Sequence, residues 1–212
     1  MRDASPAGNP VSSPPINIAL ARPLFSLDSI VCSGESKDLP VTGLPTRGKD
    51  AWSINFFVRT DKEPDNRTII AGFGRASDDT DGTGRYLCKF GDGVHFWSRL
   101  KDVGGRRTAL DVGKWQMLSA TYDGETLRLY KNGRRLSTRN VELSDDNSSV
   151  VRIAPLDPWD QKRRFTGEIR TFTIWNTALP AEALKVLQDS APTDAPASTT
   201  RPTNASASGA RE

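Results

Sequence analysis

The chain has 212 residues, of which 36% are hydrophobic and 26% are charged, enough for one globular domain but short for two with well-packed cores. Its net charge of +3 is small, so nucleic acid is not the expected partner. Two cysteines and one histidine exclude a Cys/His zinc site and a disulfide scaffold. We expect neither a membrane span nor a signal peptide, because the chain has no long apolar run and no basic leader.

The composition divides the chain into a central unit and two polar flanks. Residues 1–15 contain four Pro and three Ser and no aromatic residue, and seventeen of the 23 residues from Ser190 to Glu212 are Ala, Ser, Thr or Pro. Such segments bury too little apolar surface to offset chain entropy. We therefore predict a disordered linker over 1–15, one folded domain over 16–189 and a disordered tail over 190–212, an arrangement typical of one module of a larger chain.

Short runs with alternating apolar residues, separated by Gly, Asp and Asn, dominate the central unit and predict an antiparallel all-β fold. In the run 51–60, Trp52, Ile54, Phe56 and Val58 share one face at period two, and Phe57 is the exception on the other face. The remaining runs are TIIAGFG (68–74), YLCKF (86–90), VHFW (94–97), WQMLSATY (115–122), TLRLYK (126–131), SVVRI (149–153) and FTGEIRTFTIW (165–175).

Two turn signals predict a three-stranded meander over 115–138. Asp123-Gly124 and Asn132-Gly133 stand between the runs, and such pairs supply the positive φ angles that tight hairpins need.

The end of the domain carries two further signals. Phe172 and Ile174 share a face, but Ile169 is out of phase with them, so burial of all three predicts a β-bulge near residues 170–171. A short helix is predicted over 180–188, with Pro180 at its first position.

Three segments together resemble the concanavalin A-like lectin/glucanase superfamily, and within it the laminin G-like and pentraxin-like modules. AWSINFFVRT resembles the early strand F-T-V-S-x-W-V-R, and GKWQMLSATYDGETLRLYKNGRRL resembles the meander G-x-W-H-x-V-A-x-T-Y-D-G-x-x-L-x-L-Y-V-N-G. FTGEIRTFTIWNTALPAEALKVL resembles the closing segment of these modules. The resemblance implies an antiparallel two-sheet jelly-roll sandwich with one short C-terminal helix.

The same resemblance bears on metal binding. RYLCKFGDGVHFW resembles the laminin-type strand, but Arg85 stands where that family has a calcium-ligating Asp. A guanidinium cannot hold a cation, so we expect no cofactor and no calcium site. The acidic loop with Asp78, Asp79 and Asp81 is interpreted as a solvated turn, and the pair Asp145 and Asp146 as a plain turn.

Catalysis is not expected, although the superfamily includes glycoside hydrolases. Glycoside hydrolysis needs two carboxylates about 5 to 10 Å apart, and the E-x-D-x-E triplet of the glucanases is missing. A Ser-His-Asp site is limited to His95, which lies in an apolar run without a G-x-S-x-G elbow.

Binding residues are sought among the loop cations and one loop tryptophan. Arginines pair at 106–107 and 134–135, and a third basic cluster spans 162–164. Trp159, in the loop PLDPWDQKRR, could stack on a sugar ring while a neighbouring guanidinium contacts an acidic group; the alternative is a ring packed over the sandwich edge. The candidate ligand-binding residues are Trp159, Arg163, Arg164, Arg106 and Arg107.

We therefore interpret the sequence as a non-catalytic carbohydrate-binding module, with acidic glycans among the candidate ligands, in an extracellular, cell-surface or periplasmic protein. A protein-interaction or adhesion module that binds no sugar is the main alternative, since one fold serves both, and a divergent glycoside hydrolase is the third. The spacing of Cys32 and Cys88 leaves open whether they form a disulfide or are two buried thiols.

Overall fold

The computed structural model describes residues 22–75, 82–156 and 163–192. Within these ranges the chain forms antiparallel strands and one short helix, α1 (Ala181–Gln188). The strands are β1 (Phe25–Ser33), β2 (Lys37–Pro40), β3 (Trp52–Arg59), β4 (Ile69–Phe73), β5 (Arg85–Phe90), β6 (Gly93–Trp97), β7 (Val103–Gly104), β8 (Gln116–Tyr122), β9 (Thr126–Lys131), β10 (Arg134–Asn140), β11 (Val150–Ile153) and β12 (Thr166–Trp175).

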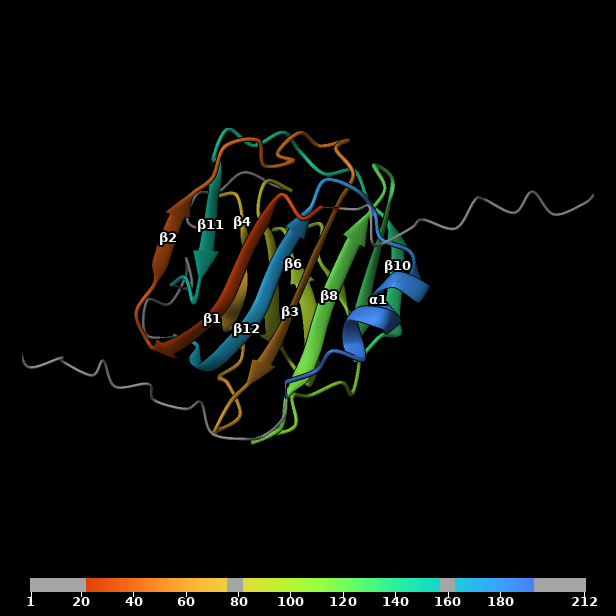
Figure 1. Ribbon diagram of the computed structural model, residues 1–212. Helices are drawn as coiled ribbons and strands as arrows, with labels where there is room; N and C mark the ends of the chain where they lie inside the picture. Colours follow the sequence, from red (N-terminus) through yellow and green to blue (C-terminus); the bar gives the residue numbers. More distant parts are fainter. Residues whose placement is uncertain (1–21, 76–81, 157–162, 193–212) are drawn as a thin grey trace, which may run out of the picture.

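The strands form two antiparallel six-stranded sheets that face each other (Figure 1). The first sheet has the order β1-β12-β3-β8-β9-β10, and the second has the order β2-β11-β4-β5-β6-β7. The all-β jelly-roll sandwich with one C-terminal helix is therefore confirmed. The helix that the structure describes is too short and too polar to cross a membrane.

The main core lies between the two sheets and is rich in aromatic rings. Trp52 of β3 has no exposed surface and contacts rings from both sheets, with centroid distances of 5.8 Å to Phe73, 5.5 Å to Phe96 and 5.8 Å to Tyr122. Offset and edge-on ring pairs of this kind add to the stabilisation from burial. At the centre of the core, Trp52 thus joins the two sheets through contacts with residues that are far apart in the sequence.

The predicted core strand 51–60 is β3, and the exception at Phe57 has a structural cause. Phe57 points to the outer face of the first sheet, yet it is only 1% exposed. A second cluster buries it there, which contains Met117, Trp175 and, from α1, Leu184. The helix lies over this face near β8 and β10 (Figure 1), so β3 is buried on both faces, although its outer face also carries the polar residues Ser53 and Asn55.

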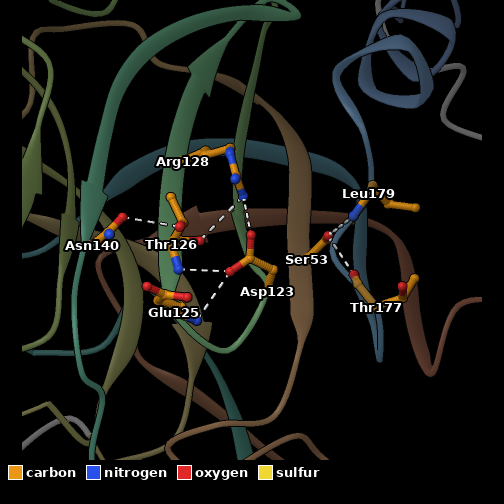
Figure 2. Close-up of polar contacts among 8 residues, drawn as sticks. All are labelled: Ser53, Asp123, Glu125, Thr126, Arg128, Asn140, Thr177 and Leu179. Atoms are coloured by element: carbon orange, nitrogen blue, oxygen red, sulfur yellow. Dashed lines mark hydrogen bonds and ion pairs between the residues drawn. The ribbon is translucent and has the colours of Figure 1, made fainter. Parts of the chain in front are cut away.

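The meander over 115–138 is confirmed as β8, β9 and β10. Gly124 has φ of 98°, and Asn132 and Gly133 have φ of 51° and 68°, as the tight turns require. The Asp123 carboxylate closes the first turn by accepting hydrogen bonds from the Thr126 N–H at 2.7 Å and the Arg128 guanidinium at 2.7 Å (Figure 2).

The predicted bulge is confirmed in β12. The pairing register with β3 shifts between Arg170 and Thr173, and Thr171 has φ of 51°. Because of this extra residue, Ile169, Phe172 and Ile174 are all fully buried.

The segment that leads into α1 is fixed to β3 by one buried hydroxyl. Ser53 donates a hydrogen bond to the Thr177 carbonyl at 2.7 Å and accepts one from the Leu179 N–H at 2.8 Å (Figure 2). The predicted helix is present, but Pro180 precedes its first turn instead of belonging to it, with an extended ψ of 162°.

Cys32 and Cys88 do not form a disulfide, and both are buried. Cys32 packs in the main core between the sheets, whereas Cys88 packs in a small cluster with Ile69 and Tyr86. The structure thus supports the second of the two alternatives that the spacing allows.

Candidate functional site

The described structure places the predicted site residues on separate parts of the surface. Trp159 lies outside the described residues. Arg163 is half-buried and Arg164 is exposed just before β12. The Arg164 guanidinium donates to the Gly34 carbonyl at 2.7 Å, so it braces the turn between β1 and β2.

Arg106 and Arg107 lie at the opposite edge of the sandwich, in the turn after β7. The segment 102–105 runs beside β10, where Arg139 donates to the Asp102 carbonyl at 2.9 Å and a Cβ at Gly105 would lie within 3.1 Å of Leu136. This edge therefore also carries Arg134 and Arg135 of β10. The fold does not bring the 106–107 pair and the 163–164 pair together, because β1 and β2 end the two sheets on one side and β10 and β7 end them on the other.

The acidic segment with Asp145 and Asp146 is not the plain turn that the sequence predicts. Asp146 is only 8% exposed and its carboxylate accepts hydrogen bonds from the Arg75 N–H at 2.6 Å and the Ser148 N–H at 2.8 Å. Asp145 accepts from the Gly48 N–H at 2.6 Å. Through these bonds, Asp145 links this segment to the connection between β2 and β3. Asp146 links it to the connection that follows β4. Asp78, Asp79 and Asp81 lie outside the described residues.

A groove on the outer face of the second sheet combines aromatic and charged side chains. Its floor comes from alternate residues of β5 and β6, because Cys88 pairs with His95 and Tyr86 pairs with Trp97 across the two strands. The rings of Tyr86 and Trp97 are 5.9 Å apart. Glycine makes room at the edge, since a Cβ at Gly104 would lie 2.0 Å from the His95 ring.

The groove has the size of a small-molecule site. One part has a volume of about 340 Å³, within the range of known ligand pockets, roughly 300 to 1,000 Å³. An adjoining part of about 170 Å³ extends it toward His95 and Gly104. The larger part is lined by Arg67, Ile69, Cys88, Phe90, Trp97, Arg99, Leu100 and Asp102.

Apolar and cationic side chains together form the rim of this groove. Phe90 is 39% exposed and Leu100 is 71% exposed, and the Arg67 guanidinium lies over the Phe90 ring at 5.6 Å. Arg67, Arg99 and Leu100 have positive φ angles of 68°, 31° and 57°. Left-handed backbone at non-glycine residues is costly and gathers at functional sites, so the rim is a candidate binding edge.

Burial controls the charges within the groove. It raises the pKa of Asp102. A hydrogen bond from the Ser98 N–H lowers this pKa, and so do electrostatic interactions with His95 and Arg139. Burial also lowers the pKa of His95 from its ordinary value, against the pull of Asp102 and Asp92. This shift favours the neutral form of His95, which presents one ring donor and one ring acceptor.

The described residues of the groove do not supply the components of the hydrolases considered from the sequence. Asp102 is the one carboxylate among the described residues that line it. Ser98, the serine nearest in sequence to His95 and Asp102, has no exposed surface. Within residues 22–75, 82–156 and 163–192, no three His, Cys, Asp or Glu side chains gather so as to hold a metal ion.

Sequence reasoning missed the groove, although a signal for it was present. The run 86–90 places Tyr86, Cys88 and Phe90 on one face, and the run 94–97 places His95 and Trp97 on one face. A half-exposed sheet is expected to carry polar residues on its outer face. Apolar residues on both faces of two adjacent strands therefore indicated that the outer face packs or binds something.

Comparison with solved structures supports the same fold. Domain 4 of AbnA, a GH43 extracellular arabinanase from Geobacillus stearothermophilus, determined in complex with arabinotriose, matches with a TM-score of 0.60 and 20% identity over 76% of each chain. The CBM40 of a Ruminococcus gnavus IT-sialidase, bound to α2,3 sialyllactose, matches with a TM-score of 0.61 and 12% identity over 79% of this chain and 100% of that one. The binding domain of botulinum neurotoxin serotype G matches with a TM-score of 0.58 and 17% identity, over 79% of this chain and 50% of that one.

Sequence comparison places the chain in a family. Mouse pappalysin-1 is 28% identical over 96 residues, which are 41% of this chain and 6% of that protein, so the chain spans only a small part of this relative. The model of the family Laminin_G_3, described as concanavalin A-like lectin/glucanases superfamily, matches residues 33–185. Since this match covers more than half of the sequence, the chain belongs to the Laminin_G_3 family of the concanavalin A-like lectin/glucanase superfamily.

Proposed function

We propose that this domain is a non-catalytic module that binds carbohydrate in the groove on the outer face of the second sheet. The observation that carries the proposal is the combination of Trp97, Phe90 and the arginines Arg67 and Arg99 around a space of about 340 Å³. Sugar-binding sites use the same two elements, a flat apolar surface for the ring face and polar groups that fix its orientation.

The ring of Trp97 is the proposed stacking surface. It is half-exposed and rests against Tyr86, which is fully buried, so its position is set by the sheet beneath. Stacking of a ligand ring on an aromatic side chain contributes about 1–3 kcal/mol in nucleic-acid cases. A sugar face on Trp97 would take the lower end of this range.

The cations at the rim favour an acidic glycan. Arg67 and Arg99 can form charge-assisted hydrogen bonds with a carboxylate or sulfate group, and Asp102 is the one acidic residue among the described residues of the lining. The similar structures support a sugar ligand, since they include a CBM40 with α2,3 sialyllactose, a botulinum neurotoxin serotype D domain with N-acetylneuraminic acid and an arabinanase domain with arabinotriose.

The absence of catalysis is part of this proposal. Both common mechanisms of glycoside hydrolysis need two carboxylates around the scissile bond, and the described part of the groove supplies Asp102. A reducing-sugar release assay separates the binding module from a divergent glycosidase. Release of sugar from a bound glycan would contradict the proposal.

A protein-interaction module is the second candidate, supported by the apolar rim. Leu100 and Phe90 are among the most exposed large apolar side chains described, and exposed apolar groups beside a cavity also fit a protein partner. On either reading we place the domain as one module of a larger extracytoplasmic protein, as the partial match to mouse pappalysin-1 supports.

The decisive experiment is a glycan array followed by titration with the best-bound glycan. Trp97→Ala should weaken binding roughly tenfold, the effect of losing about 1.4 kcal/mol, and Arg67→Gln should weaken binding of acidic glycans mainly at low salt. Lys185→Gln, which removes an exposed charge on α1 over the opposite sheet, is the matched control and should bind like the parent chain. Thermal unfolding of each variant verifies that the fold is retained.

The same titration tests the loop residues predicted from the sequence. If Trp159→Ala abolishes binding while Trp97→Ala does not, the site lies on the 155–164 loop with Arg163 and Arg164, and the groove is wrong. If Arg106→Gln with Arg107→Gln does so, the site is the β7–β10 edge. If no glycan binds, the protein-interaction module is favoured.

A further inference from the structure

Arg85 is a buried cation at one end of the sandwich. It is the first residue of β5, it pairs with Phe73 of β4, and it has no exposed surface. Its guanidinium carbon lies 5.9 Å from the centroid of the Phe73 ring, which belongs to the main core. The charge is therefore held on the core-facing side of the second sheet, away from the groove.

Backbone carbonyl groups from three segments surround this guanidinium. It donates to the carbonyl oxygens of Thr46 at 3.1 Å, Ser144 at 2.9 Å and Thr83. Thr46 lies between β2 and β3, Thr83 precedes β5, and Ser144 lies between β10 and β11. One side chain thus joins three connections that are distant in the sequence.

Three carboxylates hydrogen-bond to backbone N–H groups of the same connections. Asp146 and Asp145 accept the backbone hydrogen bonds described above, and Asp50 accepts one from the Arg47 N–H at 2.9 Å. The Asp146 N–H donates to the Thr46 carbonyl at 2.8 Å. Burial lowers the pKa of Arg85, and the nearby charges of Asp146 and Asp50 oppose this effect. The connections therefore present carbonyl oxygens to the guanidinium, and their carboxylates act on it only through longer-range charge.

We propose that the Arg85 guanidinium is a built-in cation that takes the place of a metal ion at this end of the sandwich. Backbone carbonyl oxygens are among the ligands that Ca²⁺ accepts, so the three carbonyl groups that meet here suit a cation. Calcium does not fit while Arg85 is present, because two positive charges would share one buried point. The ordering of the three connections thus depends on this side chain and is independent of calcium.

Arg85→Ala tests this role of the guanidinium, which is separate from ligand binding in the groove. Removing the guanidinium leaves an oxygen-lined space that a small cation can enter. Arg85→Ala should lower the thermal midpoint, and millimolar guanidinium chloride should raise the midpoint of this variant relative to sodium chloride of the same ionic strength. Calcium chloride should do the same, with saturation, because a ligand that binds only the folded state stabilises it.

Two controls isolate the charge from the loss of packing. The parent chain should respond neither to calcium nor to millimolar guanidinium chloride. Arg152→Ala, which removes a peripheral ion pair with Asp38 at 3.4 Å, should show no rescue by either cation. If Arg85→Ala unfolds without showing any response to the cations, the proposal is wrong.

A second pair of variants covers the case in which Arg85→Ala does not fold. Arg85→Lys keeps the charge, whereas Arg85→Met keeps much of the volume without charge. The proposal requires the lysine variant to have the higher thermal midpoint. A methionine variant as stable as the parent chain would show that Arg85 acts by packing alone.

Discussion

At the residue scale, Glu168 forms ion pairs with two arginines on the outer face of the first sheet. It pairs directly with Arg59 across β12 and β3, with the two side chains 2.5 Å apart, and it lies 3.3 Å from Arg170. Both guanidinium groups also lie over the Trp115 ring, at 5.0 Å and 4.6 Å. The hydrogen bond from Arg59 is the main cause that holds the pKa of Glu168 below its ordinary value of 4.5.

The lowered pKa predicts how stability depends on pH. Because the folded state binds the Glu168 proton more weakly than the unfolded state, this group stabilises the fold above about pH 4.5 and loses that effect as the pH falls below it. Glu168→Gln should therefore cost about 1 kcal/mol at pH 7, and its difference from the parent chain should shrink in acid. Urea unfolding at a series of pH values measures this difference.

The exposed Glu35, in the turn after β1, provides the comparison for this series. Glu35→Gln, which removes an exposed carboxylate, should leave the free energy of unfolding at pH 7 close to that of the parent chain. A constant gap between Glu168→Gln and the parent chain down to pH 2 would contradict the assigned ion pair.

At the element scale, the sequence pattern predicts most strands but not how the last element docks. Period-two alternation and the Asp-Gly and Asn-Gly turns led to the meander, and the phase break at Ile169 led to the bulge in β12. The outer face of β3 could not be predicted in this way, since burial of Phe57 depends on α1, which follows β3 by more than a hundred residues. Side-chain alternation within a segment predicts a strand. It does not show which distant segment will cover the outer face of that strand.

We expect Ser53 to be the polar residue that contributes most to the docking of α1 on the first sheet. Ser53→Ala removes both the donor to the Thr177 carbonyl and the acceptor of the Leu179 N–H, and leaving buried groups unsatisfied costs about 1–3 kcal/mol. Chemical unfolding should show this loss, with faster amide exchange in α1.

Ser119 of β8 is the matched control for this substitution. It is also fully buried, but its hydroxyl has no hydrogen-bond partner among the described residues. Ser119→Ala should therefore change the stability little. Equal losses for Ser53→Ala and Ser119→Ala would show that the two hydrogen bonds contribute nothing.

At the scale of the whole molecule, one unit between the flanks contains all of the described core. The buried apolar residues of the described clusters run from Cys32 to Leu184, and the backbone N–H groups of Ser190 and Ala191 still bond to the last turn of α1. The sequence-based boundary at 189 therefore cuts into this turn, and a cut after Pro192 preserves it.

We predict that a chain without residues 1–15 and 193–212 unfolds at the same temperature as the full chain. These flanks contain few apolar residues that could add to the core. Differential scanning calorimetry of the full and trimmed chains provides the comparison. A midpoint several degrees lower for the trimmed chain would mean that a flank docks on the domain.

Redox conditions should also leave the whole molecule unchanged. Burial raises the pKa of the Cys32 thiol to about 11, partly offset by Lys37, so this thiol should resist alkylation at pH 8 in the folded state. A reductant should not shift the thermal midpoint, and mass spectrometry after denaturing alkylation without reductant should show both cysteines modified. An unmodified pair would reveal a disulfide.

The sequence by itself determined many local features of this protein, which are most of its strands, its tight turns, the bulge in β12 and the short helix, whereas β1, β2 and β7 were not predicted. Each depends on neighbours within a few residues, through side-chain alternation or through backbone angles that Gly and Asn adopt readily. The tertiary structure alone decided which distant residues meet. Sheet order separates Arg106 and Arg107 from Arg164, brings Trp97 and Arg67 to one groove, and encloses Arg85 within carbonyl groups from three connections. No local pattern contains this information, because the contacts arise only when the two sheets are paired and packed.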